Sequence, residues 1–344
     1  MRNKQFLIVQ IAFVYVGTVV GAGFATGKEI VEFFSRFGAA GTMGILLAGG
    51  LFVHLGTKLM IIAARVRAPS FKEMNEYLMG KKAGKAVNSI MLLLLFGVTS
   101  VMVSGAGAIF EERFGLSSSA GVLASILITL LVMSRGLHGV VGVNMLVVPM
   151  LILLSAAIMG SSIKDGGLPV LYSAVNWHDF SWILSAVCYA AYNLALAQAV
   201  LVPLAYEVKD EDVLKHGGML GGMILMFIML GSHLALIHIP GAIKFEIPMA
   251  EVMNSVFSAA YYLYVLVIFG EVLTSIIGNL YGMERRLSKL IRLPRMSVIA
   301  IILALCFFLS FIGYGKLISS IYPVLGYISL LYLAALLFKK KPIK

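Results

Sequence analysis

Charged residues are scarce throughout this chain. Asp, Glu, Lys and Arg together make up 12% of its 344 residues, and 60% of the residues are hydrophobic. A soluble domain carries roughly 25% charged residues, and the mean hydropathy here is +0.98. Apolar runs of about 20 residues, the length that crosses a bilayer, recur from end to end. The sequence therefore predicts a single transmembrane domain over residues 1–344, surrounded by lipid.

Cysteine is nearly absent, and acidic residues are fewer than basic ones. The two cysteines, Cys188 and Cys306, lie inside apolar runs, which argues against a disulfide framework and against a cysteine-ligated metal site. There are 16 acidic and 27 basic residues, so the formal net charge is +11. The basic residues sit in the joints between apolar runs, a distribution typical of membrane topology and not of nucleic-acid binding.

Sequence motifs of enzymes and of nucleotide-binding loops are also missing. The chain has no HExxH, no paired intramembrane aspartates and no Ser–His arrangement, so we expect no enzyme activity and no organic cofactor. The stretch GAGFATGKE lacks the first glycine of a phosphate-binding loop and has Glu29 where Ser or Thr should follow Lys28. It also follows an apolar span and not a strand, which excludes a nucleotide site of that kind.

Ten apolar runs predict ten transmembrane helices in an all-α membrane protein. No small-residue cleavage site follows the first run, so we interpret it as a span and not as a signal peptide. The segment KFEIPMAEVMNSVF predicts a short external helix over the mouth of the protein, because Pro248 suits a first helical turn. The predicted spans cover residues 7–34, 40–64, 87–110, 118–135, 139–161, 181–206, 214–237, 258–283, 296–313 and 317–338.

The distribution of Lys and Arg sets the expected orientation. With the N-terminus in the cytoplasm, 20 basic residues fall on cytoplasmic segments and 6 on the opposite side, with Lys58 left inside a span. Cytoplasmic loops of membrane proteins carry such an excess. We therefore expect a multi-pass protein of the bacterial cytoplasmic (inner) membrane with both termini in the cytoplasm.

Two of the long spans have the composition of interrupted helices. The first reads YVGTVVGAGFATGKEI, and each of its glycines weakens a helix by about 1 kcal/mol relative to alanine. The sixth reads CYAAYNLALAQAVLVPLAYEV, with polar residues and Pro203 inside it. These spans open two halves of five spans each, roughly 7–161 and 181–338, which must have opposite orientations. Interrupted helices at matching positions of inverted repeats indicate a midplane binding site of a secondary transporter.

An interrupted helix leaves free backbone groups, which are tolerated in a membrane only where they line a cavity or bind something. Free N–H groups suit a carboxylate, and free C=O groups suit a cation such as Na⁺. Helix packing through small residues is the alternative for the glycines, and interhelical hydrogen bonding is the alternative for the polar side chains. The span-six candidates for substrate binding are Tyr189, Tyr192, Asn193 and Gln198.

Span eight carries an acidic residue inside the membrane. An intramembrane carboxylate such as Glu271 costs about 2.5–3.5 kcal/mol on insertion scales, so it is a functional candidate by default. Three roles stay open for it: a proton carrier, a neighbour of a cation, or an ion-pair partner of Lys28. Lys28 and Glu29 are further candidates for coupling or gating.

These features resemble those of LeuT-fold transporters of the amino acid–polyamine–organocation superfamily, and the whole chain is similar to YkvI-type bacterial membrane proteins. Gly17-Thr18-Val19-Val20-Gly21-Ala22-Gly23 resembles the unwound first-helix motif of sodium-coupled members, and Leu273-Thr274-Ser275 resembles their sodium-binding motif. The resemblance implies a five-plus-five inverted repeat with broken helices 1 and 6. It also implies a Na⁺ site made by the carbonyls of Gly17, Val20 and Glu271 and the hydroxyls of Thr274 and Ser275.

The same resemblance implies a substrate site between spans one, three, six and eight. Backbone amides around Gly21, Ala22, Gly23 and Phe24 would bind a carboxylate, Tyr192 or Asn193 would face the amine, and Ser104 of span three would leave space. Phe24 stands where two-sodium members have asparagine, which argues against a second sodium site. Glu271 replaces a small residue and leaves proton coupling open, whereas span five offers Asn144 and no basic side chain, which favours Na⁺.

We therefore predict a secondary active transporter that performs Na⁺-coupled symport of an amino acid or related small amine by alternating access. Proton-coupled transport by the same fold is one alternative. A ligand-sensing membrane subunit without net transport, similar to the germinant-receptor subunits of spore-formers, is the other. The expected partners are a small-molecule substrate, a coupling ion and the lipid bilayer.

Overall fold

The computed structural model describes residues 4–164, 180–237, 248–256, 261–291, 293–311, 329–340 and 342, and every regular element in these ranges is a helix. The prediction of an all-α protein is confirmed for this part of the chain. A last apolar helix covers Ser329–Phe338. The others are α1 (Lys4–Val19), α2 (Ala22–Ala25), α3 (Lys28–Phe33), η1 (Ser35–Phe37), α4 (Ala39–Leu51), η2 (Phe52–Gly56), α5 (Thr57–Val66), α6 (Phe71–Met79), α7 (Lys81–Phe114), α8 (Ser118–Met133), α9 (Leu137–Lys164), α11 (Ser181–Val208), α12 (Glu211–Leu236), α13 (Pro248–Val256), α14 (Tyr261–Ile291) and α15 (Arg295–Ser310).

Helices lie at all the predicted spans, but they differ in length. Of the last predicted span, 317–338, the part before residue 329 lies outside the described residues. Four helices are apolar but shorter than 18 residues: Lys4–Val19, Ser118–Met133, Arg295–Ser310 and Ser329–Phe338. Six are long and apolar enough to cross a membrane: Ala39–Val66, Lys81–Glu111, Leu137–Lys164, Ser181–Val208, Glu211–Leu236 and Tyr261–Ser288.

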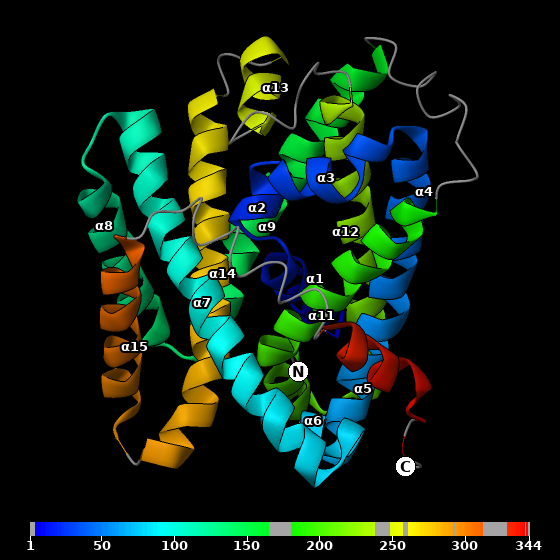
Figure 1. Ribbon diagram of the computed structural model, residues 1–344, viewed down its shortest axis with the longest axis vertical. Coiled ribbons are helices and arrows are strands. Elements are labelled where there is room, and N and C mark those ends of the chain that lie inside the picture. Colours follow the sequence, from blue (N-terminus) through cyan, green and yellow to red (C-terminus); the bar gives the residue numbers. More distant parts are fainter. Residues whose placement is uncertain are drawn as a thin grey trace.

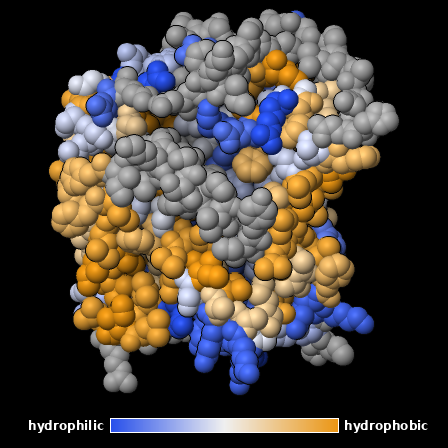
Figure 2. Space-filling model, viewed as in Figure 1, coloured by the Kyte–Doolittle hydropathy of each residue, from blue (hydrophilic) through white to orange (hydrophobic). Residues whose placement is uncertain are grey.

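Helix α1 runs through the middle of the bundle (Figure 1) and packs against α12, α9 and α11. Helices α8 and α15 lie at the left edge of this view and pack on α7, which runs diagonally from the upper left to the bottom centre, and α4 and α5 lie toward the opposite edge against α11 and α12. Hydrophobic residues cover both flanks of the molecule in Figure 2, and hydrophilic side chains project from its lower end. Apolar flanks of this extent indicate contact with a membrane.

Two adjacent glycines of α12 let α1 and η2 approach the α12 backbone closely. A Cβ added at Gly221 would lie 2.8 Å from the Tyr15 ring of α1, and one added at Gly222 would lie 2.6 Å from the Val53 nitrogen of η2. Because neither position has room for a methyl group, α1 and η2 approach the α12 backbone closely from two sides. This contact fixes α1 along one side of α12.

The first predicted span is interrupted. Helix α1 ends at Val19, the four-residue α2 begins at Ala22, and α3 begins after Gly27, whose φ of 82° is in the left-handed region that favours glycine. The predicted interruption of the sixth span is wrong, because α11 is one continuous helix with Pro203 inside it. That stretch contains no glycine and many alanines, and alanine has the highest helix propensity. The predicted pair of matched breaks is therefore not found.

Of two further elements, the short helix α13 was predicted and the π-helical turn η2 was not. The helix predicted at Pro248 is present as α13, and Met249 N donates a 3.0 Å hydrogen bond to Thr26 O, so α13 covers the segment between α2 and α3. The second span contains a π-helical turn, η2, which no sequence signal indicated. The Tyr15 hydroxyl donates to Phe52 O over 2.9 Å at this turn.

Candidate functional site

Backbone groups are left free where α1 ends. The N–H groups of Gly21, Gly23 and Phe24 have no backbone acceptor within the described ranges. Several carbonyls of the same segment receive donors from other helices: Ser275 donates to Val20 O, Tyr264 to Ala25 O, and Met249 N to Thr26 O. The segment therefore presents free amides, and its carbonyls are held by α14 and α13.

Helix α14 brings its predicted ligands to this interruption. Ser275 Oγ lies 3.3 Å from Val20 O, and a Cβ added at Gly21 would lie 3.2 Å from the same hydroxyl. Thr274 Oγ1 lies 2.9 Å from Glu271 O and 3.2 Å from Glu271 Oε2. Val20, Glu271, Thr274 and Ser275 thus supply carbonyl, carboxylate and hydroxyl oxygens from two facing helices. Oxygen ligands of this kind suit a hard cation.

The Glu271 carboxylate is completely buried, and its Oε1 atom has no hydrogen-bond partner. It forms no ion pair with a described residue, so pairing with Lys28 is excluded in this state. A buried charge without a partner is costly unless it is neutralised. Glu271 is therefore a place where a cation or a proton would be stabilised.

Gly17, predicted to offer its carbonyl, lies against α9. A Cβ added at Gly17 would lie only 1.8 Å from Asn144 Oδ1. The Asn144 amide donates to Val140 O over 2.7 Å, while Oδ1 is buried and has no partner. Asn144 was considered in the sequence only as a replacement for a basic residue, and its contact with Gly17 was not predicted.

A second acidic side chain lies on the other side of the interruption. Glu29 of α3 is 7% exposed and accepts a 2.5 Å hydrogen bond from the Tyr192 hydroxyl of α11. A Cβ added at Gly23 would lie 2.3 Å from Glu29 Oε1, so the carboxylate packs over that glycine. The Tyr192 ring packs against the rings of Phe33 and Tyr189, with the Tyr189 and Tyr192 centroids 5.5 Å apart. An acidic group among aromatic rings suits an ammonium group.

The remaining predicted residues of α11 do not form one polar surface. Asn193 Nδ2 donates to Tyr189 O one turn earlier in the same helix. Gln198 is fully buried, and both of its amide atoms lack a partner, as does the Tyr189 hydroxyl. Of the predicted residues in α11, the structure brings Tyr192 and Tyr189 to α3. Gln198 stays an unexplained buried amide.

Helix α7 approaches the interruption through Met102 and not through Ser104. The Met102 sulfur is 4.0 Å from a Cβ position at Gly21, whereas Ser104 donates to Ser310 O of α15 over 3.2 Å. Met102 was missed because an apolar side chain in an apolar run carries no sequence signal. Lys28 begins α3 and is half-buried.

The two ends of the bundle differ in free space. On the α13 side of the interruption, a cavity of about 10 Å³ among Phe24, Ala25, Met249 and Tyr264 is the size of one water. Where α1 and α9 begin and α11 ends, a larger cavity of about 570 Å³ is lined by residues that include Gln10, His138 and Glu207. Within the described part of the chain, no group of three or more His, Cys, Asp and Glu side chains could hold a metal ion.

Comparisons with known proteins agree with this arrangement. The fold is similar to that of MhsT in complex with L-phenylalanine, with a TM-score of 0.71 at 16% identity over 95% of this chain and 87% of that one. It is also similar to a manganese transporter of Eremococcus coleocola (TM-score 0.68, 11% identity, 97% of this chain and 77% of that one). Mhp1, a nucleobase-cation-symport-1 family transporter solved with bromovinylhydantoin bound, gives a TM-score of 0.55 at 13% identity over 94% and 77% of the two chains.

Relatives are found by sequence as well, although no family model matches the chain. Protein YyaD of Bacillus subtilis (strain 168) is 25% identical over 94% of both chains. The membrane protein YkvI of the same organism is 49% identical over 99% of both chains. The resemblance drawn from the glycine and Thr-Ser motifs is thereby confirmed: the chain belongs to the YkvI family of membrane proteins and has the LeuT transporter fold.

Proposed function

We propose that this protein is a secondary active transporter that carries an amino acid or a related small amine together with Na⁺ by alternating access. The observation that carries the proposal is the 3.3 Å contact of Ser275 Oγ with Val20 O at the end of α1. It joins the interruption of the first span to the one segment that has a buried carboxylate and two hydroxyls in sequence. The similar folds of MhsT, Mhp1 and a manganese transporter support transport as the class of function.

The coupling ion would be bound by oxygen atoms of α1 and α14. Carbonyls of Gly17, Val20 and Glu271 and hydroxyls of Thr274 and Ser275 make the proposed ligand set. The side chain of Glu271 adds a charge beside it, because Thr274 Oγ1 contacts both the carbonyl and Oε2 of this residue. Binding of Na⁺ would neutralise a buried carboxylate that forms no ion pair with a described residue.

Proton coupling is the second candidate, and the same carboxylate favours it. A buried glutamate with one free oxygen accepts a proton as readily as it attracts a cation. The absence of a basic residue in the apolar core of span five supports Na⁺. The two coupling modes give opposite results when the carboxylate is replaced by an amide, as described below.

The substrate would lie between the free amides and the acidic aromatic cluster. The N–H groups near Gly21, Gly23 and Phe24 suit a carboxylate. Glu29, hydrogen-bonded to Tyr192, suits an ammonium group. Both charged ends of an amino acid would then be bound at one interruption, which fits a substrate of that class. MhsT, which has a similar fold, is solved with L-phenylalanine.

The proposed setting is a bacterial cytoplasmic membrane crossed ten times. Six helices have spanning length, and the four shorter apolar ones would complete the count together with residues outside the described ranges. Helix α1 begins, and the Ser329–Phe338 helix ends, toward the same end of the bundle (Figure 1). This agrees with an even number of spans and with both termini in the cytoplasm.

Uptake by the purified protein in liposomes tests the proposal. A panel of amino acids and amines is screened with an inward Na⁺ gradient and with K⁺ in its place. We expect one class of solute to accumulate with Na⁺, and the Thr274→Ala, Ser275→Ala double variant to lose this dependence. The control removes two buried hydroxyls that bond within their own helices, Thr99 and Ser162, and should transport normally.

The outcomes separate the competing proposals. Glu271→Gln should weaken Na⁺ dependence but retain some uptake if Na⁺ is the coupling ion, whereas it should abolish pH-driven uptake if the proton is. Accumulation that is identical in the double variant and the wild type would exclude the proposed Na⁺ site. No accumulation of any solute by the chain alone would favour a ligand-sensing subunit.

A further inference from the structure

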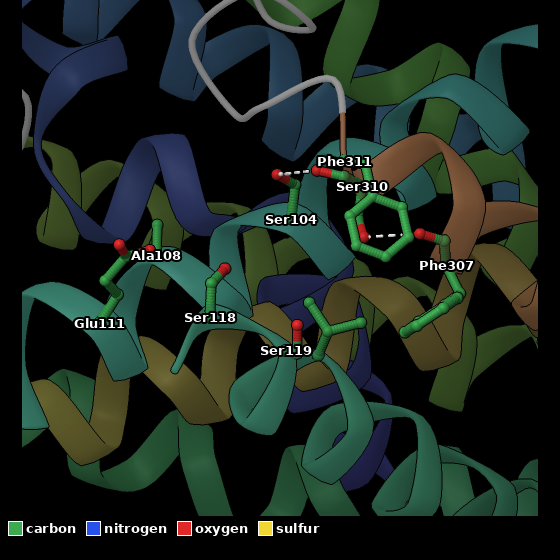
Figure 3. A pocket seen from close by; sticks show the side chains of 9 residues that line it. Ser104, Ala108, Glu111, Ser118, Ser119, Phe307, Ser310 and Phe311 are labelled. Atoms are coloured by element: carbon green, nitrogen blue, oxygen red, sulfur yellow. Dashed lines mark hydrogen bonds between the residues drawn. The ribbon is translucent and has the colours of Figure 1, made fainter. Parts of the chain in front are cut away.

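A polar cavity lies apart from the proposed transport site, where the ends of α7, α8 and α15 meet. Its volume is about 280 Å³. Figure 3 shows the hydroxyl groups of Ser104, Ser118 and Ser119 around this space, with Glu111 at one edge and the rings of Phe307 and Phe311 at the other. A cavity of this size is close to the lower limit for small-molecule sites.

The charge in the cavity is negative, and no described residue forms an ion pair with it. Glu111 lies in the last turn of α7, is exposed, and forms no hydrogen bond or ion pair with a described residue. The neighbouring Arg113 is turned toward α14, where it donates to the Tyr261 hydroxyl over 2.7 Å. Helix α8 begins at Ser118 on the cavity wall.

Two other helix ends add partial negative charge. Helices α7 and α15 both end at this cavity, at Phe114 and Ser310, and the carbonyl end of a helix attracts cations. The Ser104 and Ser310 hydroxyls already donate to Ser310 O and Phe307 O, so their lone pairs remain as acceptors. The Ser118 and Ser119 hydroxyls form no hydrogen bond with a described residue. The carboxylate, the two helix C-termini and the hydroxyl lone pairs attract a cation, and the start of α8 is the one helix N-terminus among the described elements at the cavity.

The opposite edge of the cavity is apolar. Phe311 is 66% exposed, and Phe308 and Leu131 on the outer faces of α15 and α8 are 68% and 73% exposed. Of these residues Phe311 lines the cavity itself, so the apolar edge of the cavity is continuous with the exposed apolar face of α15. A metal ion would leave this edge and most of the volume empty, whereas an amine with an apolar body would fill both. Aromatic rings also attract cations over their faces.

We propose that this cavity is a second binding site, for an amphipathic amine whose ammonium group binds Glu111 and whose apolar part lies against Phe307 and Phe311. A free amine and the headgroup of an aminolipid share this chemistry. The site does not depend on the transport function, because none of its residues contacts the interruption of the first span or the α14 hydroxyls in the described structure. It gives Ser104 a role other than the predicted one at the substrate.

Binding of two matched probes tests the site. Phenethylamine and 2-phenylethanol have the same apolar body and differ in charge, and their dissociation constants are measured by thermal-shift titration of the purified chain in detergent. We expect the wild type to bind the amine roughly tenfold more tightly than the alcohol, since charge-assisted hydrogen bonds are about twice as strong as neutral ones. Glu111→Gln should reduce this ratio to about one.

The matched control is Glu251→Gln on the exposed face of α13, which should keep the wild-type ratio. An unchanged ratio in Glu111→Gln, or equal binding of both probes to the wild type, would overturn the proposal. Repeating the titration in nanodiscs identifies the source of the amine: competition by phosphatidylethanolamine but not by phosphatidylglycerol assigns the site to a lipid, and undiminished binding in both assigns it to a soluble amine.

Discussion

The first and sixth spans are both rich in small residues, yet one is interrupted and the other is not. In the first span the small residues are glycines, and helix α1 ends at Val19. In the sixth they are alanines, and α11 continues from Ser181 to Val208 despite Pro203. The backbone groups freed in the first span meet donors from α14 and α13. The comparison teaches that a break requires both weak helix formers and outside partners for the released groups.

The largest effect should come from adding a methyl group to a glycine of the interrupted first span. Gly17→Ala would place Cβ 1.8 Å from Asn144 Oδ1, and overpacking of this kind costs about 1–3 kcal/mol. We expect a lower melting temperature and loss of Na⁺-dependent uptake. The additional change Asn144→Ala should restore most of the stability, because it removes the nearest group and leaves only Val148 Cγ2, 3.1 Å from the added Cβ.

The matched control for this prediction is Gly142→Ala on α9. A Cβ at Gly142 meets nothing within 4 Å, so this variant should be as stable as the wild type or slightly more so. If Gly17→Ala proved equally harmless, the close contact between α1 and α9 would not exist as described. The interruption of the first span and the continuity of the sixth would then be explained only by glycine in the one and alanine in the other.

A smaller effect should follow from placing glycine in the continuous span. Ala195 of α11 is buried, and Ala195→Gly should lower the free energy of unfolding by about 1 kcal/mol while uptake is retained. Ala157→Gly at an exposed position of α9 measures the propensity cost alone. A gain or complete loss of uptake in Ala195→Gly, with stability like that of the control, would show that α11 opens during the cycle and would end the contrast.

The smallest effect concerns the ion pair that joins the beginning of α1 to the N-cap of α12. Lys4 Nζ lies 3.0 Å from Asp210 Oδ2, and Asp210 also accepts from the N–H groups of Asp212 and Val213 at the start of α12. The hydrogen bond from Lys4 lowers the pKa of Asp210 below its ordinary value. The stabilisation is therefore present above the ordinary pKa of aspartate and is lost as the pH falls through the lowered value.

Two substitutions of Asp210 separate its charge from its role as a helix cap. Asp210→Asn keeps the cap and should cost little at neutral pH, as exposed ion pairs usually do, with no difference from the wild type in acid. Asp210→Ala should cost about 1 kcal/mol, because it also removes the cap. Melting temperatures measured from neutral to acidic pH test both. A pH-independent deficit in Asp210→Asn would contradict the role of its charge.

Helix positions could be predicted from local patterns in the sequence, and the pairing of α1 with α14 could be predicted only through the family resemblance of two motifs. Apolar length places the helices within a few residues, and the Gly and Thr-Ser motifs identify Val20 and Ser275, which the structure brings together. The external helix at Pro248 follows from turn chemistry in the same way. Membrane helices carry strong local signals, since each must satisfy its own backbone.

The rest depends on contacts between distant segments. Polar residues and Pro203 suggested a break in α11, but helix propensity and complete burial prevail there. Ser104 lies near Met102 in sequence, yet the two point to different neighbours, which only helix rotation decides. The contact of Asn144 with Gly17 and that of Glu29 with Tyr192 join residues more than a hundred positions apart. A single sequence contains no information on such pairs.

The π-helical turn at Phe52–Gly56 changes the direction in which the subsequent side chains of the second span point. One extra residue in a turn rotates the subsequent side chains by about 100° relative to an uninterrupted α-helix. Lys58, a basic residue inside the second predicted span, comes two residues after this turn and donates a 2.8 Å hydrogen bond to Leu337 O of the last helix. A helical wheel drawn through the whole span would place this lysine on the wrong side. The π-helical turn therefore directs the Lys58 ammonium group toward the last helix, where it donates a hydrogen bond to a backbone carbonyl.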